Sequence, residues 1–303
     1  MIDAVVIGRV GIDLYPNELS TPLRHVRTYT RFVGGFAGNV STGLARLGVR
    51  VAIVSRVGSE GHGDFVREWL AGEGVDVGFL RTDPHWPTPP TFCEVWPPDR
   101  FPITFYRRPT APDWQISVED FDAETVAAAP LLYATGTGLA QSPSRETTLA
   151  ALAAHRGTTI FDLDWRPSLW DDATDFPPLA AEAVSSSDIV IGNEEEVAAA
   201  NVSDLPRLIL KRGERGATVF EHGTRTDVPP VPVDVVNGLG AGDAFAAAVG
   251  QALLSGHTLV DAVRRGTVAG AIVAGRLACS EAMPRLAELE AAVAGAAEQG
   301  TET

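Results

Sequence analysis

VVNGLGAGDAF, residues 235–245, is a glycine-rich turn that runs directly into a predicted helix. Gly238, Gly240 and Gly242 allow backbone amides to approach an anion closely, because glycine has no Cβ. The start of a helix adds partial positive charge at the same place. The stretch therefore predicts a phosphate site at the N-terminus of a helix.

An acid, Asp243, completes this turn. A carboxylate at an anion site does little for stability, but it suits a base that accepts the proton of an attacking hydroxyl. The alternative is an ordinary glycine loop in which Asp243 only begins the helix. After it, Phe245, Val249 and Leu253 are spaced by four, so the helix buries one face and ends near Gly256.

Outward from this stretch, short apolar runs alternate with helix-period segments. This alternation is typical of a parallel sheet covered by helices on both faces. Between the first two runs, Val40, Leu44 and Leu47 share one helix face, and Gly48 ends that helix. We expect an α/β fold of three layers (α/β/α). The expected buried strands are residues 4–7, 51–54, 131–135, 159–163, 188–193 and 207–211.

A second, smaller sheet is indicated by residues 91–109, where two β-branched and aromatic runs flank the turn sequence PPDR. Residues 26–33 alternate like a strand as well. Open α/β folds bind ligands at the carboxyl ends of their strands. We therefore expect one domain over residues 1–303, with lid segments at about 12–34 and 91–109 above that edge.

The composition excludes several classes of protein. With 45% hydrophobic and 21% charged residues, the chain is typical of a soluble enzyme, and no apolar run reaches the roughly 18 residues of a membrane span. The opening MIDAVVIGRVGID resembles a first strand, not a signal peptide, so we expect a cytoplasmic protein. A net charge of −15 argues against nucleic acid as a partner. Two cysteines, Cys93 and Cys279, predict neither a disulfide framework nor a zinc site.

The segment Gly240-Ala241-Gly242-Asp243 resembles the C-terminal signature of the PfkB, or ribokinase-like, carbohydrate kinases. The resemblance implies a ribokinase-like fold in which Asp243 is the catalytic base and the preceding amides form an anion hole. It also implies that ATP binds along Gly238, Gly240 and Gly242.

Earlier motifs match the sugar side of such kinases. Gly34-Gly35 followed by Asn39 resembles the family's glycine pair and sugar-contacting asparagine, and Asp13 resembles the acid that grips substrate hydroxyls. Taken alone, the glycine pair could be a turn after an edge strand, and Asp13 a solvated loop acid.

Later motifs match the nucleotide side. Asn193 and Glu196 resemble the family's N-x-x-E element, and Lys211, Gly213 and Gly216 resemble its nucleotide loop. The resemblance implies ATP and Mg²⁺ as cofactors, with Glu196 contacting the metal through water. The alternatives are favourable charge at a helix start for Glu196 and a snorkelling strand residue for Lys211. The five motifs occur in the family's order along nearly the whole chain.

Several strings resemble one branch of the family, the 5-dehydro-2-deoxygluconokinases of inositol breakdown. They are residues 8–16, 91–94, 106–113, 162–167, 236–243 and 278–284. This resemblance implies phosphorylation of the 6-hydroxyl of a keto-deoxy sugar acid. The alternatives within the family are a 2-keto-3-deoxygluconate kinase, a fructokinase or a nucleoside kinase.

A sugar acid carries a carboxylate, which arginine binds with paired hydrogen bonds. The candidates are Arg9, Arg107, Arg108 and Arg166. Arg166 is favoured because it follows a core strand, whereas the pair at 107–108 could be a solvated hairpin end. Asp162 and Asp164 beside it are expected to orient that arginine or to hold metal-bound water, unless they are plain loop acids.

The chain departs from many relatives at Asn237-Gly238, where they carry Asp-Thr, and this puts activation by a monovalent cation in doubt. It also carries Asp164 where many have Asn. Two other classes of protein are alternatives: a sugar- or nucleotide-binding protein without catalysis, and a dinucleotide oxidoreductase. The latter needs G-x-G-x-x-G, which Gly8-Arg9-Val10-Gly11 lacks. Exposed lid edges suggest a homodimer.

Overall fold

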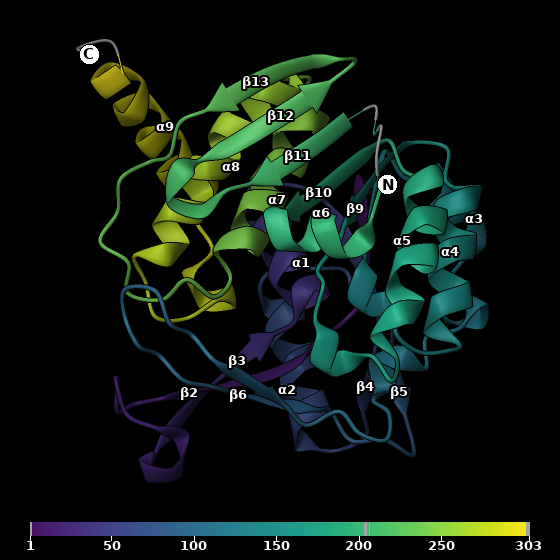
Figure 1. Cartoon of the computed structure of the whole chain (residues 1–303). Helices are drawn as coiled ribbons and strands as arrows, with labels where there is room; N and C mark the ends of the chain where they lie inside the picture. Colours follow the sequence, from purple (N-terminus) through teal and green to yellow (C-terminus); the bar gives the residue numbers. More distant parts are fainter. Residues whose placement is uncertain (1, 203–204, 206, 301–303) are drawn as a thin grey trace.

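A nine-stranded sheet forms the centre of the computed structural model, which describes residues 2–202, 205 and 207–300 (Figure 1). Its strands lie in the order β13-β12-β11-β10-β9-β8-β1-β4-β5. All neighbours from β11 to β5 are parallel, and β12 and β13 are antiparallel at one edge. The bounds are β1 Ala4–Ile7, β4 Val51–Gly58, β5 Leu80–Asp83, β8 Leu131–Thr135, β9 Thr158–Asp162, β10 Ile189–Asn193, β11 Arg207–Lys211, β12 Ala217–Glu221 and β13 Thr224–Val228.

Helices cover both faces of this sheet, which confirms the expected three layers. Successive side chains of β1 point to opposite faces of the sheet: Ala4 and Val6 belong to one apolar core, and Val5 and Ile7 to the other. The first core takes α1 Phe36–Arg46, α2 Gly61–Gly72, α7 Ala241–Leu254 and α8 Leu259–Ala274. The second takes α3 Ala123–Ala128, α4 Ser144–Ala154, α5 Phe176–Ser185 and α6 Glu194–Ala200.

The last helix, α9 Leu286–Gly300, packs on α8 through Leu289. Helix α1 ends just before Gly48 and α7 just before Gly256, both of which have positive φ, so these two expected ends are confirmed. None of the helices in the described residues combines the length and the apolarity that a membrane crossing requires.

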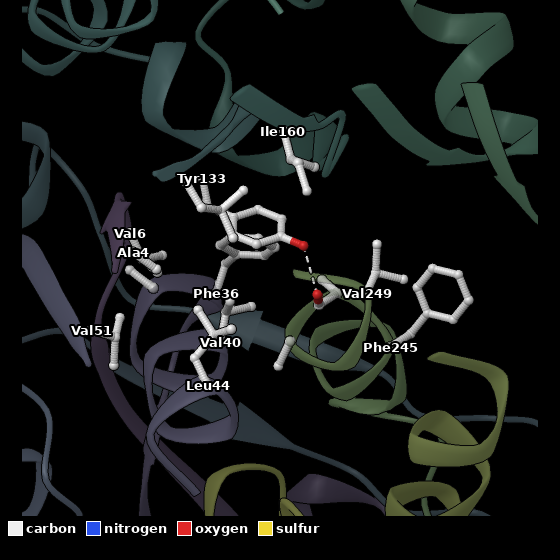
Figure 2. Close-up of a cluster of buried hydrophobic side chains, with 14 of the residues drawn as sticks. Ala4, Val6, Phe36, Val40, Leu44, Val51, Tyr133, Ile160, Phe245 and Val249 are labelled. Carbon is white, nitrogen blue, oxygen red and sulfur yellow. Dashed lines mark hydrogen bonds between the residues drawn. The ribbon is translucent and has the colours of Figure 1, made fainter. Parts of the chain in front are cut away.

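Close packing fixes α7 against both α1 and the sheet (Figure 2). A Cβ on Gly43 of α1 would lie 2.6 Å from that of Ala247, and one on Gly250 would lie 2.8 Å from the ring of Tyr133. The Tyr133 hydroxyl donates a 2.6 Å hydrogen bond to the carbonyl of Ala246. The helix that begins with the glycine turn is therefore held by glycine contacts and one buried hydrogen bond.

The second sheet has four strands in the order β3-β2-β6-β7 and lies below the large sheet in Figure 1. Its strands are β2 Gly11–Pro16, β3 Tyr29–Gly34, β6 Pro90–Cys93 and β7 Ile103–Phe105. Strands β6 and β7 are antiparallel neighbours, as the hairpin around PPDR predicted. We call this sheet the lid.

An apolar cluster joins the inner face of the lid to the large domain. Tyr15 and Cys93 from the lid pack there with Cys279, and Phe101 and Leu239 border them. A Cβ on Gly238 would lie 3.0 Å from the ring of Phe101. The lid therefore touches the glycine turn, and the space between them becomes a pocket.

Candidate active site

The glycine turn reaches its helix through a residue with left-handed backbone, Gly240, whose φ is +82°. A Cβ there would lie 2.7 Å from the Sγ of Cys279, so both conformation and space require glycine. A Cβ on Gly242 would lie 3.7 Å from the Nζ of Lys211. The first-turn amides of α7 and an ammonium group thus lie together, which is an arrangement suited to an anion.

Asp243 occupies the first turn of α7 and lines the pocket. Its Oδ2 accepts a 2.7 Å hydrogen bond from Nδ2 of Asn39, which α1 supplies. Burial raises the pKa of Asp243 to about 6, against the opposing effect of Asn39. A carboxylate with such a pKa is ionised at neutral pH and can still accept a proton, as a general base must.

The glycine pair at the end of β3 makes room for two other groups. A Cβ on Gly34 would overlap the carboxyl group of Asp13, and one on Gly35 would lie 2.6 Å from the carbonyl oxygen of Arg9. Gly35 also has a φ of +87°. The pair is therefore required by both Asp13 and the backbone of Arg9.

Asp13 points from β2 into the pocket and is 8% exposed. Burial raises its pKa to about 7, while Arg9 acts to lower it and Asp243 adds to the rise. In the described part of the chain it forms no ion pair within 4 Å. This carboxyl group is consequently available to accept hydrogen bonds from a bound molecule.

At the other end of the pocket, three parallel strands deliver charged groups. Nζ of Lys211, at the end of β11, lies 3.0 Å from Oδ2 of Asp162 and 3.8 Å from Oε2 of Glu196. Burial opposes the charge on Lys211, but these two carboxylates hold its pKa above the ordinary value. Asn193 and Glu196 cap α6 reciprocally: the backbone amide of each donates a 2.8 Å hydrogen bond to a side-chain oxygen of the other.

Asp164 lies between two arginines. Its carboxylate is 3.2 Å from Nη2 of Arg166 and 3.6 Å from Nη2 of Arg9, and it accepts a 2.8 Å hydrogen bond from the hydroxyl of Thr137. Burial opposes its ionisation, but the arginines outweigh burial and hold the pKa of Asp164 below its usual range. Its φ of +35° is uncommon for a residue with a side chain. The backbone therefore adopts an uncommon conformation at the residue that carries this carboxylate.

The structure brings most of the sequence-predicted residues to this one pocket. They are Arg9, Asp13, Gly35, Asn39, Asp162, Asp164, Arg166, Glu196, Lys211, Gly238, Gly240, Gly242 and Asp243. Gly34 and Ala241 adjoin lining residues. Asn193 caps α6 beside Glu196, and the loop at 213–216 follows β11 without lining the pocket.

Two expected substrate arginines do not line the pocket. Arg107 is buried in an ion pair with Asp113, with its guanidinium 4.6 Å from the ring centre of Trp114. Asp113 also accepts a hydrogen bond from the amide of Val10, so this pair ties the two ends of the lid together. Arg108 pairs with Asp171 at an exposed position. Both guanidinium groups are thus paired with acids of the protein outside the pocket, although the Nε of Arg107 is left without an acceptor.

Sequence reasoning overlooked the apolar wall of the pocket, which consists of Tyr15, Cys93, Ile103, Phe105 and Cys279. The hydroxyl of Tyr15 lies 2.7 Å from the Sγ of Cys279. Alternation along β2 was a usable signal, because Tyr15 lies two residues after Asp13 and must share its face.

Known proteins resemble this chain in sequence and in fold. A 5-dehydro-2-deoxygluconokinase of Clostridium tetani is 32% identical, with 95% of this chain and 92% of the relative covered. One of Shouchella clausii is 33% identical, with 96% and 95% covered. A sugar kinase of Pyrococcus horikoshii in complex with ATP superimposes with a TM-score of 0.85 at 26% identity, covering 94% of this chain and 96% of that one.

A fructokinase of Vibrio cholerae, solved with fructose, ADP and a calcium ion, superimposes with a TM-score of 0.86 at 25% identity. The alignment covers 96% of this chain and 99% of that one. Residues 1–286 match the family described as pfkB family carbohydrate kinase. The ribokinase-like fold is thereby confirmed, and the chain belongs to the pfkB family of carbohydrate kinases, which makes it an ATP-dependent phosphotransferase.

Proposed function

We propose that this chain transfers the γ-phosphoryl group of ATP to the terminal hydroxyl of 5-dehydro-2-deoxygluconate, giving the 6-phosphate and ADP. The observation that carries the proposal is that one pocket holds the Asp243 carboxylate, the glycine turn and Asp13. The relatives from Clostridium tetani and Shouchella clausii are named for this activity, and their alignments cover 95% and 96% of this chain. Both relatives support the proposed substrate.

In the proposed step, Asp243 accepts the proton of the terminal hydroxyl while its oxygen attacks the γ-phosphorus in line. The bond from that phosphorus to the bridging oxygen breaks, and its electron pair leaves with ADP. Asn39 holds the carboxylate in place through the 2.7 Å hydrogen bond. The amides from Gly240 to Asp243 stabilise charge on the group in transfer.

We place the ATP phosphates beside Lys211 and Arg166. Both cations line the pocket on the side of the glycine turn, and both are already oriented by carboxylates. A positioned cation stabilises the charge that develops on a transferring phosphoryl group. The roles of Asn193, Gly213 and Gly216 in nucleotide binding remain proposals that rest on the family resemblance.

The donor set suits Mg²⁺ that arrives with the nucleotide. The described residues contain no group of three or more acidic, histidine or cysteine side chains placed to hold a metal. Mg²⁺ keeps several waters and often binds through one or two carboxylates and substrate phosphates. Asp162 and Glu196 line the pocket beside Lys211 and would hold such waters, with Asp164 near them. The ion would neutralise charge on the phosphates.

We propose that the lid holds the sugar hydroxyls through Asp13 and keeps water from the transfer. Water is the competing nucleophile in any phosphoryl transfer, so exclusion protects ATP. The contact between Phe101 and Gly238 supports this role, because it joins the lid to the glycine turn.

A panel of acceptors tests the proposed function. The purified chain, ATP and Mg²⁺ are combined with 5-dehydro-2-deoxygluconate, 2-keto-3-deoxygluconate, fructose and a nucleoside, and ADP release is followed with a coupled assay. We expect the highest kcat/KM for the first of these. A higher value for another acceptor would overturn the substrate, and binding without any ADP release would indicate a non-catalytic sugar-binding protein.

We also propose a homodimer formed through the lid. The outer side of the lid carries Tyr106, which is 60% exposed and packs edge-on against Phe92, itself in contact with Tyr29. An exposed aromatic residue on a sheet with two open edges favours pairing with a second copy. Light scattering of the wild-type chain and of Tyr106→Glu should give dimer and monomer masses, respectively. A monomeric wild-type chain would refute the proposal.

A further inference from the structure

Arg9 has a hydrogen-bonding capacity that the protein leaves unused. It follows β1, just before the lid begins, and its side chain lines the pocket while being only 12% exposed. Its Nε is buried and meets no hydrogen-bond acceptor among the described residues. A buried donor without a partner costs about 1 to 3 kcal/mol, so such a group calls for a ligand.

The guanidinium group is nevertheless held firmly. The ring of Phe105 lies under it, with 5.5 Å between its Cζ and the ring centre, and Asp164 lies 3.6 Å from its Nη2. The backbone is fixed as well, because the amide of Ala37 donates a 2.9 Å hydrogen bond to the carbonyl of Arg9. The group is therefore oriented before a ligand binds, which lowers the entropic cost of binding.

The other cations near the pocket are already engaged. Lys211 donates hydrogen bonds to both oxygens of Asp162, at 3.4 and 3.0 Å. Arg166 lies between two carboxylates, at 3.2 Å from Asp164 and 3.6 Å from Glu196. Arg107 is paired with Asp113, and although its Nε is also buried without an acceptor, its side chain does not line the pocket. In the described residues, Arg9 is thus the pocket arginine with a buried N–H group left over.

Two of the acids near Arg9 have partners of their own. Asp164 is occupied by Thr137 and Arg166, and Asp243 by Asn39. Asp13 lies in a cross-strand row of the lid with Thr91 and then Phe105. Arg9, Asp13, Thr91 and Phe105 all line the same pocket, so one bound molecule can contact both Arg9 and Asp13.

We propose that Arg9 is the specificity residue that binds the carboxylate of the sugar acid, and that Asp164 is the positioning residue that holds Arg9 for it. Nε and an Nη of Arg9 donate parallel hydrogen bonds to the two carboxylate oxygens. The inference rests on the proposed function, since only an acidic substrate brings this carboxylate. It also gives a physical reason for an acid at position 164, which balances two arginines.

The test compares the keto-deoxy sugar acid with its carboxamide, which has nearly the same shape but no charge. Binding of both is measured by calorimetry with a non-hydrolysable ATP analogue present. The wild-type chain should bind the acid more tightly than the amide. Arg9→Gln should weaken binding of the acid roughly 10- to 100-fold and change binding of the amide by less than about threefold, because a charge-assisted bond is lost only with the acid.

Three further variants separate recognition from folding. Arg9→Lys should recover part of the preference for the acid, because it keeps the charge without the planar fork. Asp164→Asn should weaken binding of the acid about 3- to 10-fold and leave binding of the amide unchanged, because Arg9 then loses its electrostatic partner. Arg100→Gln is the matched control: this exposed lid arginine stacks on Trp96, does not line the pocket, and should keep the wild-type preference.

The two proposals can fail separately. Equal weakening of acid and amide in a folded Arg9→Gln protein, or an unchanged preference for the acid, would overturn the role of Arg9. A wild-type chain that phosphorylates a neutral sugar but not the acid would instead overturn the proposed function. Thermal melting of each variant identifies any that fails to fold, and in that case Arg9→Lys carries the test.

Discussion

The two ends of the pocket differ in how their charges are paired. At the phosphate end, Lys211 and Arg166 are surrounded by Asp162, Asp164 and Glu196. At the sugar end, Asp13 has no ion pair among the described residues, and Arg9 and Asn39 each keep a buried polar atom without a partner there. At the phosphate end the charged groups pair with one another, whereas at the sugar end polar groups lack partners that a ligand can supply. Changes at the first should therefore cost stability, and changes at the second should cost activity alone.

The largest effect is expected where the two ends meet, at Asp243. Asp243→Asn keeps the shape and the contact with Asn39 but removes the base, so kcat should fall about 100- to 10,000-fold. The dissociation constant of ATP, measured by calorimetry, should stay within about threefold of wild type. Turnover close to wild type in the coupled assay would refute the assigned role.

The next effect concerns the network at the phosphate end. Lys211→Met leaves Asp162 and Glu196 buried without their cation, and should lower the free energy of unfolding by about 3 kcal/mol as well as slowing turnover. Urea denaturation measures the first effect. The double variant Lys211→Met with Asp162→Asn should recover part of the stability but not the activity. A stable single variant would mean that the network does not hold this end together.

A smaller effect of opposite sign is expected at the sugar end. Burial raises the pKa of Asp13 to about 7 in the folded protein, above its ordinary value of 3.8. As the pH rises from about 4 to about 7, the unfolded chain loses this proton first, so the contribution of Asp13 to stability falls. Asp13→Asn should therefore raise the free energy of unfolding by a few kcal/mol at pH 8, and the gain should vanish near pH 4.

Activity should change in the other direction for the same variant, because the sugar loses its acceptor. If Asp13→Asn destabilised the protein at pH 8, the division between the two ends would be wrong. Urea denaturation at the two pH values supplies the measurement.

The smallest effect lies outside both ends, beneath the helix that carries Asp243. Tyr133→Phe removes the buried hydrogen bond to the carbonyl of Ala246 and should cost about 1 kcal/mol of unfolding free energy. Activity should be nearly unchanged, because the close packing at Gly43 and Gly250 still positions α7. A large loss of activity would show that this bond, and not packing, places the base.

Much of the fold could be predicted because its main determinants are local. The apolar runs at 4–7 and 131–135 became β1 and β8, and the turn PPDR separates two lid strands. The antiparallel edge was not predicted. Strand β13, with the sequence TRTDV, has a mostly exposed and polar pattern. It pairs with β12, which in turn pairs with β11.

The site divides in a similar way. Asp243 and Lys211 could be found because glycine turns and strand ends mark them in the sequence. The position of Arg107 could not, because its partner Asp113 lies in the following loop and no local pattern selects that acid over a substrate carboxylate. Cys279 was overlooked because it reaches the pocket only when the lid packs on the segment around it.

The most direct test of the central claim is the pH dependence of the transfer step itself. Rapid-quench measurements with saturating ATP and sugar acid report the groups ionised in the bound complex. Since burial raises the pKa of Asp243 to about 6, the single-turnover rate should fall about tenfold per pH unit below that value in the wild-type chain, and the residual rate of Asp243→Asn should not. A wild-type rate that stays constant between about pH 5 and pH 8 would contradict Asp243 as the base.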